Sequence, residues 1–276
     1  MRLTPWLLGL LACATTGFAA QPCRIEIVEK GDGWPVSGVE LRTVHGARFV
    51  SDNAGLIAFD LPELMGRETW FSVHGHGYGV KADGFGYSGV RLTPKPGQTL
   101  KVTVERTILA RRLGRLTGAG LFAESQKLGE QLDWKESGVL GSDSVVTAKL
   151  GGKMLWFWGD TNLAHYPLGI FNVSAASTDK FVPPAKPPLR PPYAYVSERK
   201  TAQSELRPRG VAKVPGDGPT WIWGAITLPD AKGAPHLVAA AVKTKGEMHA
   251  YRWDLVEWDP HEELFHPLDT VWTEDT

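Results

Sequence analysis

One stretch of the sequence, residues 138–161, constrains the fold more than any other. Its first half, Ser144 to Leu150, is rich in β-branched and small residues, and its second half, Lys153 to Trp158, is apolar and aromatic. Between them lies Gly151-Gly152, a pair that permits the positive φ angles of a two-residue turn. The pattern predicts an antiparallel β-hairpin.

Two acidic residues flank this hairpin at its open end. Asp143 directly precedes the first strand, and Asp160 directly follows the second. Because antiparallel pairing aligns the ends of the two strands, we expect both carboxylates at one edge of the sheet. Hydrolysis of a glycosidic bond requires two carboxyl groups, one protonated and one ionised. The hairpin therefore predicts a carbohydrate-directed site, and the alternative for each aspartate is a bond to the backbone of its own turn.

Composition narrows the class of partner. The chain has 30 Lys and Arg against 30 Asp and Glu with no basic run, which argues against nucleic acid or an anionic membrane surface. Its 11 tryptophans favour either core packing or aromatic faces on which sugars stack. Trp156 and Trp158 are two residues apart, as are Trp221 and Trp223, so each pair is expected to share one strand face. Each pair predicts a sugar platform, with packing between sheets as the alternative.

The predicted site combines these acids and aromatic residues with the polar residues that follow Asp160. The catalytic candidates are Asp143 and Asp160, and the candidates for substrate binding are Trp156, Trp158, Asn162, His165, Tyr166 and Trp223. The sequence contains no phosphate-binding or dinucleotide-binding loop followed by a helix and no nucleophile elbow, so no cofactor is predicted. His74 and His76 could converge on one strand face, but two ligands are too few, and no metal site is predicted.

The first 20 residues have the pattern of a secretory signal peptide. Arg2 is followed by an apolar run from Trp6 to about Ala14 and then by small residues. The run is too short to span a bilayer, so we expect a secreted or periplasmic protein with no membrane span. Cleavage at a lipoprotein-type box before Cys13 is the alternative. After ordinary cleavage Cys23 is the only cysteine, which excludes an internal disulfide.

The remaining chain predicts an all-β protein with two domains. Residues 21–108 contain short strand patterns separated by turn signals, typical of a small β-sandwich. Residues 109–136 are expected to form a linker that packs on the second domain, with Arg111, Arg112 and Arg115 in solvent. Residues 137–276 repeat a hairpin-bearing unit of about four strands, which predicts propeller blades; a continuous sandwich is the competing architecture.

The N-terminal domain resembles a known family in the order of its turn motifs. Pro35-Val36-Ser37-Gly38-Val39, then Ser51-Asp52-Asn53-Ala54-Gly55, then residues 97–104 follow the order found in transthyretin-like sandwiches beside carboxypeptidases. The resemblance covers about 85 residues. It implies a structural or adhesive module without catalytic residues.

The C-terminal domain resembles another family around residues 141–162. The segment contains an Asp, then a hydrophobic strand, then Gly-Lys, and then Trp-Phe-Trp-Gly-Asp-Thr. This order is similar to the first blade of the five-bladed propeller superfamily of arabinanases and xylosidases, and to related bacterial domains. The resemblance implies a general-base role for Asp143 alone, with Asp160 as a tuning or turn residue and a general acid on a later blade. Glu198, Glu205 and Asp217 are weak candidates for that acid.

Two blades do not close a propeller ring, so the sequence indicates either a fragment or strands supplied by a partner. The leading hypothesis is an exported protein that hydrolyses or binds a polysaccharide or oligosaccharide. The alternatives are a non-catalytic module that binds glycan or protein, and a truncated, inactive product.

Overall fold

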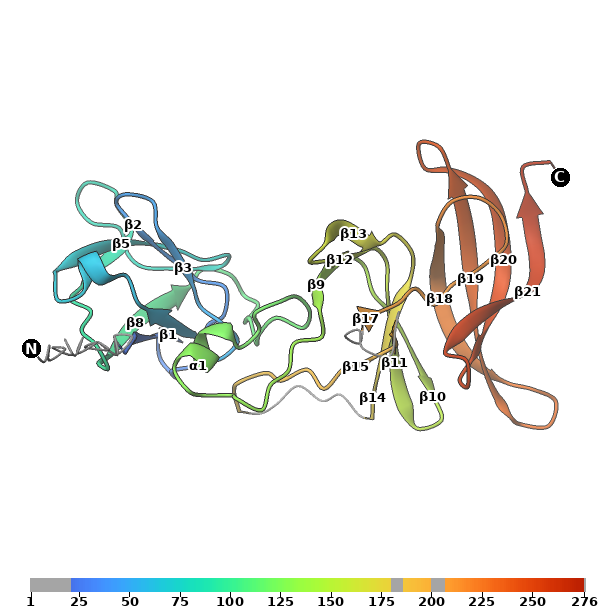
Figure 1. The fold of residues 1–276 in the computed structure, drawn as a ribbon, viewed down its shortest axis with the longest axis horizontal. Coiled ribbons are helices and arrows are strands. Elements are labelled where there is room, and N and C mark those ends of the chain that lie inside the picture. The colour runs from blue at the N-terminus through green and yellow to red at the C-terminus, as the bar shows by residue number, and fades with distance from the viewer. Residues whose placement is uncertain (1–20, 180–185, 200–206, 276) are drawn as a thin grey trace, which may run out of the picture.

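The computed structural model describes residues 21–179, 186–199 and 207–275. Over these ranges the protein is all-β, as the sequence predicts, and its only α-helix there is the short α1 (Ala123–Lys127). The chain runs from an N-terminal pair of sheets through a connecting segment to a C-terminal group of sheets (Figure 1). The predicted signal peptide, with Cys13, lies outside the described residues.

The N-terminal unit consists of two four-stranded sheets. The first has the order β4-β1-β8-β6, with strands at Leu56–Phe59, Cys23–Glu29, Thr99–Arg106 and Tyr78–Gly79. The second has the order β3-β2-β5-β7, with strands at Arg48–Val50, Glu40–Thr43, Thr69–His74 and Gly89–Leu92. A short 3-10 helix, η1 (Pro62–Leu64), lies between β4 and β5. Neighbouring strands are antiparallel except β1 and β8, which are parallel.

Alternation along β1 builds the core between these sheets. Cys23, Ile25 and Ile27 are fully buried, and the residues between them are partly exposed. They pack in one cluster with Phe71 of the second sheet, so the two sheets form a sandwich. Burial raises the pKa of the Cys23 thiol, which therefore acts as a small apolar side chain.

The turn between β3 and β4 ties the sandwich to the connecting segment. Asp52 is buried, and its carboxylate accepts hydrogen bonds from the amide and the hydroxyl of Ser125 in α1, both at 2.7 Å. Asn53 accepts from the Arg115 amide and donates to its carbonyl, each at 2.9 Å. Because each contact joins residues more than 60 positions apart, the segment is fixed by tertiary contacts rather than by local structure.

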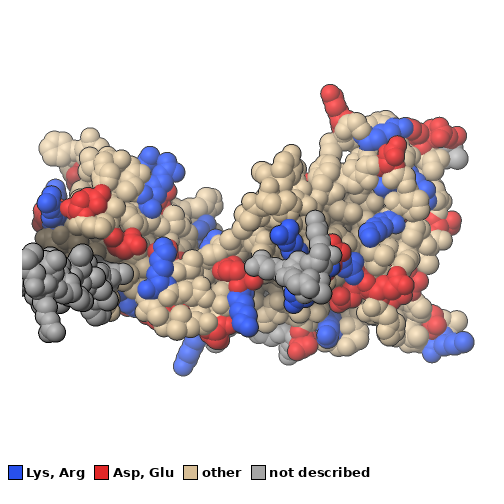
Figure 2. Space-filling view, in the orientation of Figure 1, with Lys and Arg blue, Asp and Glu red and all other residues tan. Residues whose placement is uncertain are grey.

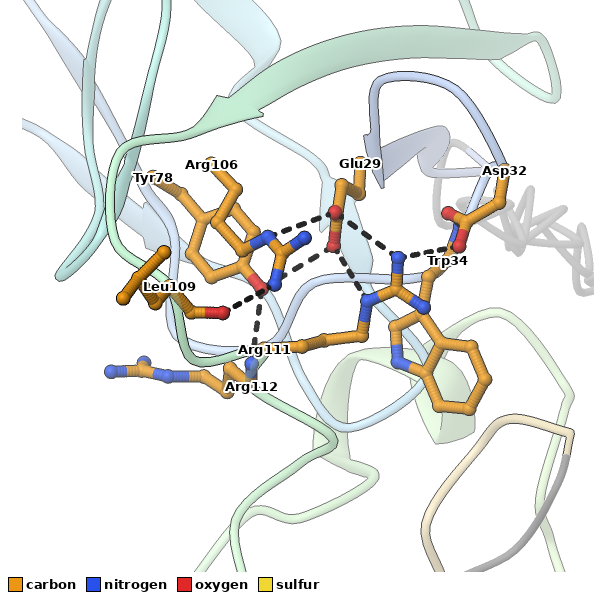
Figure 3. Close-up of polar contacts among 8 residues, drawn as sticks. All are labelled: Glu29, Asp32, Trp34, Tyr78, Arg106, Leu109, Arg111 and Arg112. Atoms are coloured by element: carbon orange, nitrogen blue, oxygen red, sulfur yellow. Dashed lines mark hydrogen bonds and ion pairs between the residues drawn. The ribbon is translucent and has the colours of Figure 1, made fainter.

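A buried carboxylate anchors the start of the connecting segment (Figure 3). Glu29, at the end of β1, lies within 3.2 Å of the Arg106 Nε atom and 3.0 Å of the Arg111 Nε atom. The Tyr78 hydroxyl donates to the same carboxylate at 3.4 Å. Two guanidinium groups thus surround one acid that is almost excluded from water.

The contacts of the connecting segment correct the prediction that its three arginines lie in solvent. Arg111, Arg112 and Arg115 were expected in solvent, yet Arg111 pairs with Glu29, and Arg112 donates to the Ser37 carbonyl at 3.2 Å. Burial lowers the pKa of Arg115. Arg111 and Arg112 thus contact acceptors of the N-terminal sandwich. Later residues of the segment contact the second domain as well, because Gln131 and Asp133 accept hydrogen bonds from Arg190.

The C-terminal region contains two four-stranded antiparallel sheets whose strand order follows the chain. The first consists of β10 (Val146–Leu150), β11 (Lys153–Trp158), β14 (Ser174–Thr178) and β15 (Ala194–Tyr195). The second consists of β18 (Thr220–Pro229), β19 (Pro235–Lys245), β20 (His249–Asp259) and β21 (Leu264–Thr273). Gly151 and Gly152 both have positive φ, which confirms the predicted hairpin turn.

One aromatic core joins these two sheets face to face. Phe157 of β11 lies 5.2 Å from Trp258 and 5.0 Å from Phe265, measured between ring centroids. Leu237 and Val256 are fully buried in the same cluster. Two smaller sheets flank this core. They are β13-β12-β9, at Tyr166–Ile170, Thr161–Leu163 and Val139–Ser142, and β16-β17, at Ser197–Glu198 and Arg207–Pro208.

Charges of both signs are interspersed on the face of the molecule shown in Figure 2. This mixture agrees with the equal numbers of acidic and basic residues in the sequence. Within the described ranges, no helix has the length and apolar character needed to cross a membrane.

Candidate functional site

The two predicted catalytic aspartates lie side by side where a long hairpin bends from one sheet into another. β9 ends just before Asp143, and β12 begins just after Asp160, with Thr161 opposite Ser142. The Asp143 amide donates to the Asp160 carbonyl at 3.1 Å. The predicted juxtaposition is therefore present. The hairpin end is not free, however, because pairing continues beyond it in the β13-β12-β9 sheet.

Asp160 is the partly buried member of this acid pair, the name used below for Asp143 and Asp160. Burial raises the pKa of the Asp160 carboxyl, and the negative charge of Asp143 raises it further. The Trp221 indole N–H donates to its Oδ1 atom at 2.9 Å, which offsets part of this increase. The Asp160 carboxylate thus accepts a hydrogen bond from a tryptophan on the neighbouring sheet and, within the described ranges, none from the backbone of its own turn.

Asp143 is exposed and is held differently. Its carboxylate accepts from the Ser144 hydroxyl at 3.2 Å and, among the described residues, from no backbone amide. The Gly159 amide donates instead to the Asp143 carbonyl at 3.2 Å. A Cβ atom at position 159 would collide with the Asp143 carboxylate, so the glycine there leaves the space that this carboxylate occupies. The Asp143 side chain thus remains open to a ligand.

Aromatic side chains surround the partly buried acid. The Trp221 ring packs edge-on against Phe171, with centroids 5.3 Å apart at 82°. Phe171 is 46% exposed, and Trp223, two residues beyond Trp221 on β18, is 58% exposed. These two exposed rings offer the apolar faces on which a sugar ring could stack.

The Trp156 and Trp158 pair has another role. The two rings stack on one strand face, as the alternation predicts, at 6.5 Å between centroids and 11° between planes. Tyr193 and Tyr195 pack against Trp158 at 5.1 and 5.4 Å, and Trp158 is only 4% exposed. Burial also raises the Tyr193 pKa to about 12. Trp158 is a packing residue, because the segment after β14 returns to cover the face on which a sugar was expected.

The polar residues predicted at the mouth of the site lie on β12 and β13. The Asn162 side chain accepts a hydrogen bond from the Leu168 amide at 2.8 Å, so it shapes the turn between these strands. Tyr166 is 65% exposed. His165 lines a cavity of about 340 Å³ that also includes Phe171. The sequence prediction located this region but not the cavity.

The acids suggested for a later blade are placed elsewhere. Glu198 lines the same 340 Å³ cavity as His165. Asp217 lies in the turn before β18, where its carbonyl accepts from the Tyr251 hydroxyl at 2.7 Å. Glu205 lies outside the described residues. The acid that lies beside Asp143 is instead Asp160, for which the resemblance implies only a tuning or turn role.

Sequence reasoning missed three further features. Phe171 follows β13 without any pattern that marks it, although it completes the surroundings of Trp221. A cavity of about 810 Å³ lies between the two C-terminal sheets, lined by His236 and Trp258 among others. The turn between β20 and β21 gathers Asp259, Glu262 and His266 with donor atoms within 4.8 Å of one another. His266 and Glu262 form an ion pair at 3.0 Å, which accounts for their closeness.

Comparison with known proteins adds little to this geometry. No protein-family model matches the chain, and no curated protein matches it. Among solved structures, the Bacillus anthracis TIE protein is similar at a TM-score of 0.20 and 10% identity, covering 92% of this chain. The chain spans about half the length of that protein, 48%. A similarity of this size carries no argument about fold or function.

Proposed function

We propose that this protein acts on a polysaccharide at the acid pair, Asp143 and Asp160, by hydrolysis of a glycosidic bond. The observation that carries this proposal is the raised pKa of Asp160 beside the charge of Asp143. Environments that push apart the pKa values of two neighbouring carboxyl groups are typical of acid and base pairs in catalysis. Asp160 is then the proton donor, and Asp143 is the base or nucleophile.

The surroundings favour a sugar over other substrates. Trp221 binds Asp160 from the neighbouring sheet, Phe171 packs against Trp221, and Trp223 follows two residues later on β18; both Phe171 and Trp223 have exposed rings. Stacking on aromatic rings places a sugar without requiring charge. The two face-packed, four-stranded sheets with sequential strand order are the connectivity of propeller blades, and we infer that they are blades related to those of the glycoside hydrolases. A secreted or periplasmic location, with the transthyretin-like sandwich as an accessory module, completes the proposal.

Reducing-sugar release from arabinan, xylan and sulfated algal polysaccharide tests this function. Asp143→Asn keeps the size of the side chain and removes its charge, so it is expected to abolish release. Asp60→Asn is the matched control, because Asp60 is an exposed acid on the N-terminal sandwich. Release by the wild type that persists at full rate in Asp143→Asn would reject the catalytic role of the acid pair.

A second candidate function is binding without catalysis. Strands β18 and β21 expose a series of large apolar side chains, namely Trp223, Ile226, Leu228, Leu268, Val271 and Trp272. Exposed apolar patches mark surfaces that bind other molecules. Retention on a polysaccharide gel without release of reducing sugar from any substrate would favour a glycan-binding module, and retention lost in Trp223→Ala would place its contact on β18.

A further inference from the structure

A small cavity near the acid pair has more cationic than anionic side chains in its lining. It measures about 340 Å³ and includes Arg207, Arg209 and Lys213, with Glu198 as the single carboxylate. His165 lines it as well. Cavities of this size lie at the lower end of the range for small-ligand sites. The excess of positive charge is local, because the protein as a whole is neutral.

The three cations differ in how they are held. The Nη2 atom of Arg209 donates to the carbonyls of Glu262 and Glu263, at 2.7 and 3.2 Å, which fixes its guanidinium. Arg207 and Lys213 are exposed, and neither makes an ion pair within the described part of the chain. Glu198 lies opposite Arg207 in the β16-β17 pair, so it compensates only part of the positive charge. The cavity therefore keeps cationic groups available for an anion.

Phe171 connects the cavity to the acid pair. It lines the cavity and packs against Trp221, which donates to Asp160. Ile170, next to it in the chain and also on the cavity wall, lies opposite Thr161 in the β12-β13 pair. Two aromatic side chains in contact, Phe171 and Trp221, thus link the cationic cavity to Asp160. A ligand of several sugar units could contact both.

We propose that this cavity is a subsite for an anionic sugar, one that carries a carboxylate or a sulfate ester. Guanidinium groups bind the planar oxygens of carboxylate or the oxygens of sulfate with two parallel hydrogen bonds, and a lysine adds a point charge. The acid pair repels the same anionic group. The two charged regions therefore orient the glycan, with its charged unit in the cavity and a glycosidic bond at Asp143 and Asp160. This inference rests on the proposed function.

Binding to matched charged and neutral polymers tests the subsite. The probes are polygalacturonate and its fully methyl-esterified form, together with dextran sulfate and dextran. The first pair tests a carboxylate and the second a sulfate, and each neutral member has the same backbone as its charged partner. The wild type is expected to bind at least one charged polymer more tightly than its neutral partner.

Two double variants separate the cavity from general electrostatics. Arg207→Gln/Lys213→Gln is expected to weaken binding of the preferred charged polymer by about tenfold or more, the size of a lost charge-assisted contact. Lys95→Gln/Lys101→Gln removes two exposed charges from the N-terminal sandwich and is expected to stay within about twofold. Equal losses in the two variants, or no loss in the first, would overturn the subsite.

The outcomes distinguish this inference from the proposed hydrolysis. Sugar release from a charged polymer that depends on Asp143 and is unchanged in Arg207→Gln/Lys213→Gln would overturn the subsite and leave the hydrolase. Charge-dependent binding lost only in Arg207→Gln/Lys213→Gln, with no release from any polymer, would support the subsite and reject hydrolysis. Equal binding of charged and neutral polymers by the wild type would also overturn the subsite.

Discussion

The two halves of the protein each hold a carboxylate withdrawn from water, and they treat it in opposite ways. In the N-terminal sandwich, Glu29 is surrounded by Arg106 and Arg111, and Tyr78 donates to it as well. In the C-terminal region, Asp160 lies beside another acid, Asp143, and accepts a hydrogen bond from an uncharged indole. A buried carboxylate that is paired with arginines stabilises the folded structure. A carboxylate that lies beside a second acid costs stability, and folding alone does not explain why such a pair is present.

This difference is the reason that we assign Glu29 to the structure and the acid pair to the proposed chemistry. Removing Glu29 would leave Arg106 and Arg111 without their buried carboxylate, with only the more exposed Asp32 still paired with Arg111, so the contribution of Glu29 is to stability. Removing the charge of the exposed Asp143 would relieve its repulsion of Asp160, so stability gains little from keeping that charge. An acid pair that persists against this cost is the better candidate for chemistry. The predictions below test the contrast by opposite effects on activity and on stability.

The largest expected effect is on activity at the acid pair. Asp143→Asn should lower turnover by about 10²- to 10⁴-fold, the usual contribution of a general acid or base. The same change should leave the melting temperature unchanged or slightly higher, because it removes a negative charge next to Asp160. Turnover and thermal unfolding measured on one preparation check both statements. A large fall in melting temperature would mean that Asp143 is structural, like Glu29.

The opposite result is expected at the N-terminal junction. Glu29→Gln should lower the free energy of unfolding by about 3 kcal/mol, because it leaves two guanidinium groups without their buried partner. Glu105→Gln is the control, since Glu105 pairs with Lys30 at the exposed surface and the change should affect stability much less. Urea unfolding curves measure both variants. Equal effects in the two variants would remove the distinction between the buried and the exposed acid.

The sequence predicted local pairing well and distant contacts poorly. The strand that begins near Val146 and the turn at Gly151-Gly152 follow from alternation and from positive φ, which are local properties. The prediction that Asp143 and Asp160 meet follows from the same hairpin. The pairing of Glu29 with Arg111 joins residues 82 positions apart, and no local pattern marks either as a partner.

The candidate site shows the same limit. Alternation correctly placed Trp156 and Trp158 on one face, yet it does not identify what covers that face. The residues that cover Trp158 are Tyr193 and Tyr195, which are distant from it in the sequence. The cationic cavity likewise combines strands that are far apart in sequence. Periodicity gives the direction of a side chain, whereas its neighbours depend on how the sheets pack.

A smaller effect is expected from a glycine that touches the acid pair. Gly159→Ala places a methyl group against the Asp143 carboxylate and the Ser144 hydroxyl, both of which are side-chain groups that can rotate away. The change should therefore lower turnover by about tenfold through displacement of Asp143, with little loss of stability. Gly151→Ala, in the hairpin turn, is the control. Gly151 has a φ of 57°, at which an alanine would strain the turn, and the space around its Cβ atom is open. Gly151→Ala should lower stability and leave turnover of the folded protein unchanged.

The smallest expected effect is a shift in pH dependence. The Trp221 indole hydrogen bond lowers the pKa of Asp160, so Trp221→Phe should raise that pKa further. If Asp160 donates the proton, activity requires its protonated form and falls as the pH rises through its pKa. The alkaline limb of the kcat/KM profile should therefore move to higher pH, by less than about one unit, the scale of one neutral hydrogen bond. Phe171→Leu, which alters the packing of Trp221 but keeps its N–H, is the control and should leave the limb in place. A shift to lower pH in Trp221→Phe would mean that the indole acts mainly by excluding water from Asp160, and the alkaline limb would then report the burial of this acid rather than its hydrogen bond.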